Sequence, residues 1–167
     1  MNMSIEKIVI FILCFIYNFT VFAQDHSTMQ MQHKQVEISE GVLIPQINIS
    51  LTEDTITGFN LHIDLINYQI ESPVYKNPPV KNTINGHAHL FINGKKVTRL
   101  YGNDLYINAD LLNPGVNIVA VTLNSHGHDT WTYKERPITA SVTLDTRKDN
   151  PVIHSFSSSP LNMDSEI

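Results

Sequence analysis

Residues 86–101 read Gly-His-Ala-His-Leu-Phe-Ile-Asn-Gly-Lys-Lys-Val-Thr-Arg-Leu-Tyr. Over residues 87–92, Ala, Leu and Ile alternate with His, His and Phe, which is the period-two pattern of a strand with one face in the core. Asn93 and Gly94 follow, and this dipeptide favours a type I′ turn because both residues accept positive φ. Residues 97–101 then return, so the stretch predicts a β-hairpin.

Two histidines of this hairpin face the same way. His87 and His89 project from the face opposite the aliphatic residues, and two neutral imidazoles at that spacing can share one metal ion. A second His-x-His pair, His126 and His128, is followed directly by Asp129. The two pairs together are a stronger indication of a metal site than either pair alone.

The directions of the predicted strands suggest where the two pairs meet. If the strands alternate in direction, His87 begins one strand at the same end where His126 and His128 follow another. The four imidazoles and Asp129 would then converge on a site for copper or zinc. In the alternative interpretation, the first pair covers a sheet face and the second lies in a solvated loop.

Short β segments with turn signals between them surround the hairpin. Apart from the hairpin, strands are predicted over 36–39 with a continuation over 42–44, and over 46–52, 59–65, 105–112, 116–123, 131–133 and 138–144. Residues 116–123 are the most continuously apolar and predict a central buried strand. The pattern predicts an all-β fold, an immunoglobulin-like antiparallel β-sandwich of about seven to eight strands, with the domain spanning 36–145.

The composition of the N-terminal segment predicts an exported protein. Residues 1–23 have the apolar run and the small-residue ending of a signal peptide, with a retained membrane anchor as the alternative. Cleavage after Ala23 would leave a periplasmic or secreted chain that does not associate with the membrane and has no cysteine, since Cys14 lies in the signal. Residues 24–35 then form a flexible tail, and residues 146–167 a polar C-terminal tail.

The predicted N-terminal tail contains thioethers and imidazoles. His26, Met29, Met31 and His33 lie within eight positions, and this mixture suits copper, since Met favours Cu(I) and His serves both oxidation states. The alternative is a solvated linker in which these residues are incidental.

Several functional classes find no support in the sequence. The net charge of −5 provides no basic surface for nucleic acid. No phosphate-binding glycine motif and no Gly-x-Ser-x-Gly elbow is present, and the single cysteine lies in the signal. We therefore do not expect an enzyme.

The stretch 86–102 resembles the core of a group of uncharacterised bacterial exported proteins, Gly-His-Ala-His-Leu-x-x-Asn-Gly-x-Lys-x-x-Arg-x-Tyr-Gly. A Pro-Gly turn at 114–115 and a strand ending in Leu-Asn at 123–124 are also similar, so the resemblance covers about residues 60–145. The group tends to carry Asp-His next, where this chain has His126 through Asp129. The resemblance implies an exported β-sandwich and no particular activity.

The sequence therefore favours an exported metal-binding protein, with copper ahead of zinc, that acts as a carrier or buffer. The rival hypothesis is a metal-independent module that binds another exported protein. Aromatic residues anchor many interfaces, and the candidates here are Trp131, Tyr101, Tyr106 and Tyr133.

Overall fold

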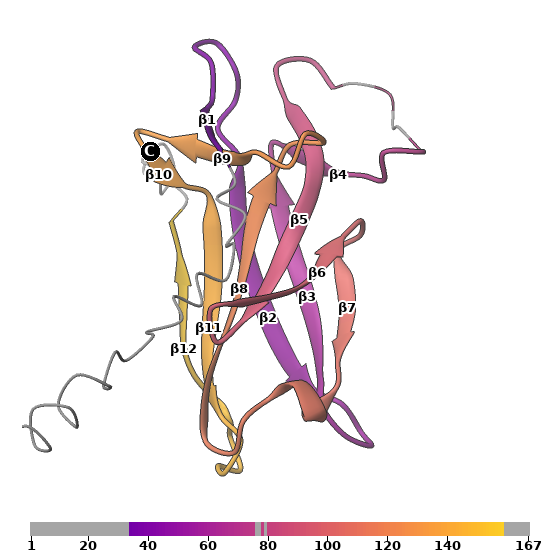
Figure 1. Ribbon diagram of the computed structural model, residues 1–167, viewed down its shortest axis with the longest axis vertical. Helices are drawn as coiled ribbons and strands as arrows, with labels where there is room; N and C mark the ends of the chain where they lie inside the picture. The colour runs from indigo at the N-terminus through magenta and orange to yellow at the C-terminus, as the bar shows by residue number, and fades with distance from the viewer. Residues whose placement is uncertain (1–33, 76–77, 79, 159–167) are drawn as a thin grey trace, which may run out of the picture. The chain divides into compact units, whose positions relative to one another are not determined.

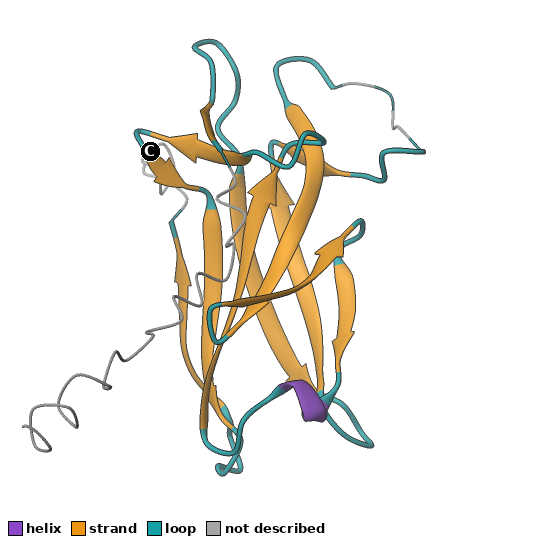
Figure 2. Ribbon diagram, viewed as in Figure 1, coloured by secondary structure: helices purple, strands orange, loops and turns teal. Residues whose placement is uncertain are grey.

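The computed structural model describes residues 34–75, 78 and 80–158, and strands dominate them (Figures 1 and 2). One short 3-10 helix, η1 (Ala109–Leu111), is the only helical element among these residues. The strands are β1 (Gln35–Glu37), β2 (Gln46–Glu53), β3 (Phe59–Ile66), β4 (Tyr68–Ile70), β5 (Ile84–Ile92), β6 (Lys95–Leu100), β7 (Asp104–Ile107), β8 (Val116–Asn124), β9 (Thr130–Tyr133), β10 (Arg136–Pro137), β11 (Thr139–Asp145) and β12 (Val152–Ser157).

The strands form two sheets, which confirms the predicted all-β sandwich. The smaller sheet has the order β2-β3-β7. The larger sheet follows β1-β9-β8-β11-β12, with β5 joining β8, β6 joining β5, and β4 and β10 pairing at the margins. Two short pairs are parallel, β1 with β9 and β4 with β5, and the other pairs are antiparallel.

The core lies between the sheets and is built from alternate residues of each strand, as a half-buried strand requires. Strand β8 is central, as predicted: it pairs with β5, β9 and β11, and five of its nine residues are fully buried, three of them aliphatic. The core side chains of the long strands are Ile47, Ile49, Leu51, Phe59, Leu61, Ile63, Ala88, Leu90, Ile92, Val119, Val121, Leu123, Ala140, Val142 and Leu144.

The hairpin of β5 and β6 forms as predicted. Asn93 and Gly94 have φ of 52° and 77°, the positive values that a type I′ turn needs. A register shift between Leu90 and Phe91 then places Lys96 opposite Phe91. Such a bulge redirects the side chains beyond it. Lys96, one of these side chains, contacts His89 of β5.

Two predicted strands differ from the structure. The strand expected over 105–112 ends at Ile107, because Asn108 caps η1: its side-chain oxygen accepts a hydrogen bond from the Asp110 amide at 3.0 Å. The continuation over 42–44 is not a strand, since Gly41 has φ of 83° and the Val42 amide donates to the Ser39 carbonyl within a turn.

The C-terminal boundary also differs. The polar tail expected from residue 146 instead contains β12, which pairs antiparallel with β11 and extends the sheet beyond Asp145. All six side chains of β12 are exposed, so this edge strand needs no apolar alternation and gives the sequence no clear strand pattern.

Some predictions concern residues outside the described ranges. These are the signal peptide over 1–23, the tail ligands His26, Met29, Met31 and His33, and residues 159–167. Within the part of the chain that is described, no helix is both long and apolar enough to cross a membrane.

Candidate metal centre

Two histidines are buried on the outer side of β5. His87 and His89 are 1% and 0% exposed, although their face of the strand points away from the core between the sheets. They are covered by Lys96 of β6, by His128 from the turn after β8, and by the Tyr101 ring, whose centroid lies 5.7 Å from that of His87. The outer face of β5, which the strand pattern would leave in solvent, is therefore buried at His87 and His89.

The tight turn after β8 places the His128 side chain next to His87. The start of β5 lies beside the end of β8, where His87 pairs with Asn124, so the strand directions counted from the sequence are confirmed. The Ser125 amide then donates to the Asp129 carbonyl and the His128 amide to the Ser125 carbonyl. His128 has φ of 71°, a left-handed conformation within this turn.

Three imidazole nitrogens converge at this place. His87 Nε2 lies 2.9 Å from His89 Nε2 and 3.2 Å from His128 Nδ1, and one ligand atom from each residue lies within 4.8 Å of the other two. Nitrogens bound tetrahedrally to one zinc ion lie about 3.3 Å apart, given a metal–nitrogen distance of about 2.0 Å. Small rotations of the rings would therefore let all three histidines bind one ion.

A lysine contacts one of these nitrogens. Lys96 Nζ lies 3.2 Å from His89 Nε2. An ammonium group can only donate, so His89 Nε2 is the acceptor and its ring proton belongs on Nδ1. His87 Nε2 then carries the proton that it directs toward His89, and a metal ion would replace that proton. Burial lowers the pKa of Lys96, and Arg99 lowers it further.

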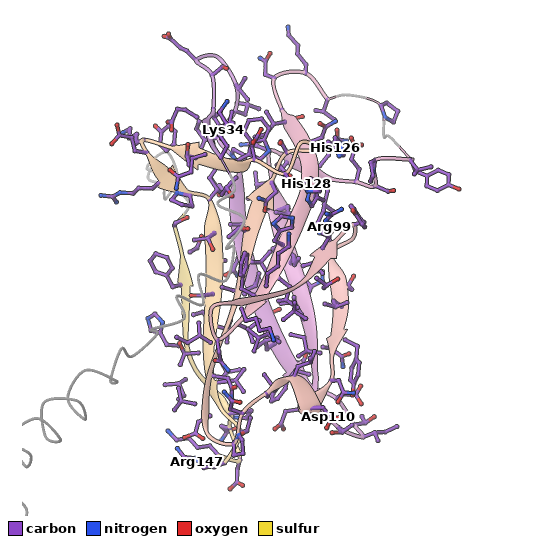
Figure 3. All side chains as sticks on the ribbon, in the orientation of Figure 1. Lys34, Arg99, Asp110, His126, His128 and Arg147 are labelled. Atoms are coloured by element: carbon purple, nitrogen blue, oxygen red, sulfur yellow. The ribbon has the colours of Figure 1, made fainter. Side chains whose placement is uncertain are left out.

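The fourth histidine of the predicted set lies beside the cluster and has a different partner. His126 Nε2 lies 3.1 Å from a carboxylate oxygen of Glu71, whose side chain is 1% exposed. The His126 and His87 rings are roughly stacked, with centroids 6.4 Å apart. Figure 3 shows His126, His128 and Arg99 in one region of the domain, far from the labelled Asp110 and Arg147.

The acidic residue beside the histidines is Glu71, which the sequence analysis missed, and not the predicted Asp129. Asp129 is not in the three-histidine group, and its backbone closes the turn through Ser125. Glu71 supplies the carboxylate instead. It follows β4, which pairs with the start of β5, and its amide donates to the Gly86 carbonyl at 2.7 Å. Residues 70–83 resemble a simple connection in sequence, so nothing there identifies Glu71.

The environment of His87 keeps its imidazole neutral, the form that binds metals. Burial lowers the pKa of His87 to about 4, and nearby basic groups add to the shift: His128, Arg99, His126 and Lys96.

This shift predicts that the metal-free protein becomes less stable in acid. Because the folded pKa of about 4 is below the ordinary value of 6.5, the unfolded chain binds a proton more readily between these two pH values. The contribution of His87 to stability is therefore complete above pH 6.5 and is lost as the pH falls toward 4. The loss should be on the order of 2 kcal/mol.

Denaturant unfolding of the chelator-treated protein between pH 4 and 7 would measure this loss. His87→Gln should flatten the curve relative to the wild-type protein. The comparison is needed because His62 acts in the opposite direction: its hydrogen bond to Asp104 raises its pKa, so its contribution is greater at low pH. An equally steep curve for His87→Gln would contradict the prediction.

The aromatic residues of the rival hypothesis are in different environments. Trp131 and Tyr133 pack against the core, whereas Tyr101 and Tyr106 are exposed. The Tyr106 hydroxyl donates to the Thr57 carbonyl, and the Tyr101 ring adjoins His87. Two of the four candidate contact residues are therefore part of the core packing, and two remain at the surface.

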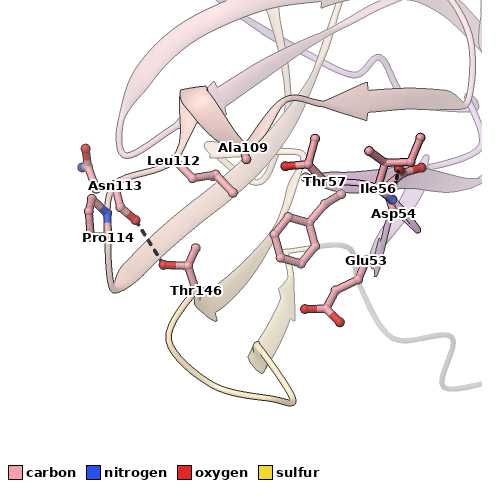
Figure 4. Close-up of a pocket in the computed structure, with 11 residues that line it drawn as sticks. Glu53, Asp54, Ile56, Thr57, Ala109, Leu112, Asn113, Pro114 and Thr146 are labelled. Carbon is pink, nitrogen blue, oxygen red and sulfur yellow. Dashed lines mark hydrogen bonds between the residues drawn. The ribbon is translucent and has the colours of Figure 1, made fainter.

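A pocket lies at the opposite end of β8 from the histidines (Figure 4). Its volume is about 570 Å³, and its lining combines two acidic side chains with apolar and small polar ones. It contains no histidine, and its lining residues are Glu53, Asp54, Ile56, Thr57, Gly58, Phe59, Ala109, Leu112, Asn113, Pro114 and Thr146. The group of three histidines therefore lies outside this pocket.

The comparisons with known proteins do not add to this geometry. No protein-family model, no curated protein and no solved structure matches the chain. The candidate centre therefore rests on its own residues, a group of three histidines compatible with a bound metal ion.

Proposed function

We propose that this protein is an exported metal-binding protein, with copper as its preferred ion, that acts as a carrier or buffer rather than as a catalyst. The observation that carries the proposal is the convergence of His87, His89 and His128 on one point. Three imidazole nitrogens, two from a paired strand and one from a hydrogen-bonded turn, already lie close together, and such preorganisation lowers the cost of binding.

His126 is the fourth ligand in this proposal. Its Nε2 faces the buried Glu71 carboxylate, so the neutral ring carries its proton there and its Nδ1 carries a lone pair. That Nδ1 atom is buried and has no hydrogen-bond partner in the described part of the chain. Metal-ligating histidines usually donate their other ring N–H to a carboxylate in this way, and a small movement of the turn would bring Nδ1 toward the ion.

Imidazole ligands suit copper and zinc alike, so the choice of copper rests on the N-terminal segment. His26, Met29, Met31 and His33 would capture copper or transfer it to a partner, since thioethers favour Cu(I). Export to the periplasm or the exterior is part of this proposal and follows from the signal-like residues 1–23.

Metal titration of the chelator-treated protein tests the proposal. Cu(I), Cu(II) and Zn(II) would each be titrated into the wild-type chain and into a variant with His26, Met29, Met31 and His33 all changed to alanine. We expect saturable binding of one ion that survives loss of the four tail residues. Binding that disappears with the tail would reject the folded site, and absence of binding in both proteins would favour the interaction module.

A further inference from the structure

A positive charge lies within the proposed metal site. The bulge in the hairpin turns Lys96 toward β5, and its amino group lies 3.2 Å from His89 Nε2. The same nitrogen lies 2.9 Å from His87 Nε2, so the lysine contacts one of the nitrogens that converge in the three-histidine group. Lys95, its neighbour in sequence, is exposed.

This contact has a chemical consequence for any metal that binds. The ammonium of Lys96 and the N–H of His87 share the one lone pair of His89 Nε2, and a metal ion needs that lone pair. The ion and Lys96 therefore compete for one atom, so binding must break this hydrogen bond. The competition weakens the affinity for every cation.

Electrostatic repulsion adds a term that depends on the charge of the ion. The Coulomb energy is proportional to the product of the two charges, so Lys96 repels a divalent ion about twice as strongly as a monovalent one at the same distance. Arg99 is the direct cross-strand partner of His89 and adds a second positive charge nearby. The buried carboxylate of Glu71 supplies a negative charge, although it pairs with His126.

We propose that Lys96 determines the cation selectivity of this centre, weakening the binding of all metal ions and of divalent ions most, so that the site favours a monovalent soft cation such as Cu(I) over Zn(II). This inference rests on the proposed function, since it assigns the selectivity of the same site. It also suits a carrier, because a retained positive charge lowers affinity and allows the ion to be released.

Replacing Lys96 tests the inference through a gain of affinity, which general damage to the fold would not produce. The dissociation constants of Zn(II) and Cu(I) would be measured by competition with chromogenic chelators, with Cu(I) handled anaerobically. Lys96→Met should tighten Zn(II) binding by about tenfold or more and Cu(I) binding by a smaller factor. Lys95→Met removes an equal charge outside the site and should change neither constant appreciably.

Lys96→Arg separates charge from side-chain shape and should keep the wild-type preference. The inference is overturned if Lys96→Met leaves both constants unchanged, if it tightens both ions equally, or if Lys96→Arg tightens Zn(II) as Lys96→Met does. Should Lys96→Met fail to fold, Lys96→Gln gives the same comparison. Failure of the wild-type protein and of every variant to bind either ion would instead reject the proposed function. Binding that appears only in Lys96→Met would support the inference and reject that function for the wild-type chain.

Discussion

The double substitution His87→Ala and His89→Ala should abolish metal binding at the folded site. Two of the three converging nitrogens are lost, and the two turn histidines of the proposed set, His126 and His128, cannot by themselves hold an ion tightly. Since removing a group that only supports a metal ligand typically costs tenfold to a hundredfold in affinity, losing two ligands should raise the dissociation constant by about a hundredfold or more. Calorimetric titration of the chelator-treated variant would measure the change.

Controls separate the loss of ligands from damage to the fold. His62→Ala with His154→Ala removes two exposed histidines elsewhere and should leave the affinity unchanged. The strand histidines are fully buried, so their replacement also creates a cavity, and a thermal melt must show a folded variant.

His128→Asn is the gentler variant. Asparagine tolerates the left-handed conformation of that turn position, where φ is 71°, so the backbone should be preserved. Wild-type affinity in both His128→Asn and the double variant would refute the assignment.

The hairpin and the meeting of the two histidine pairs could be predicted from sequence. Strand period and the Asn93-Gly94 turn fix which residues of β5 face the core, so His87 and His89 had to share the other face. Alternating strand directions then place the turn after β8 beside the start of β5. These are local rules that need no knowledge of side-chain packing.

The environment of the histidines could not be predicted, because it depends on contacts between distant segments. Glu71 reaches His126 across 55 positions of sequence, by way of a short parallel strand in a connection that contains prolines. Lys96 reaches His89 because a bulge shifts the register by one residue, and periodicity does not reveal a bulge. Glu71 and Lys96, which contact the rings of His126 and His89 and bring charge to the site, therefore could not be identified from the sequence.

Replacing Gly86 by alanine should damage the fold and the metal site together. A Cβ atom at this position would lie 2.1 Å from the Asn124 carbonyl oxygen and 2.6 Å from the Tyr68 hydroxyl oxygen. Real Cβ atoms do not approach backbone so closely, so β5 and the end of β8 must move apart. The Tyr68 hydroxyl, which lies 3.0 Å from the His87 carbonyl and 2.9 Å from that of Asn124, would lose its place between the strands.

The expected cost of Gly86→Ala is about 3 kcal/mol of unfolding free energy, the upper part of the range for overpacked interiors. The melting temperature should fall by about 10 °C for a domain of this size. Gly102→Ala is the matched control, since a Cβ at Gly102 meets nothing within 4 Å, and it should melt like the wild-type protein. Because His87 follows Gly86 directly and the histidine turn begins after Asn124, the displaced strands should also weaken metal binding. A variant that melts at the wild-type temperature would show that the two strands can accept a side chain here, and that the close approach of β5 to β8 does not hold the site in place.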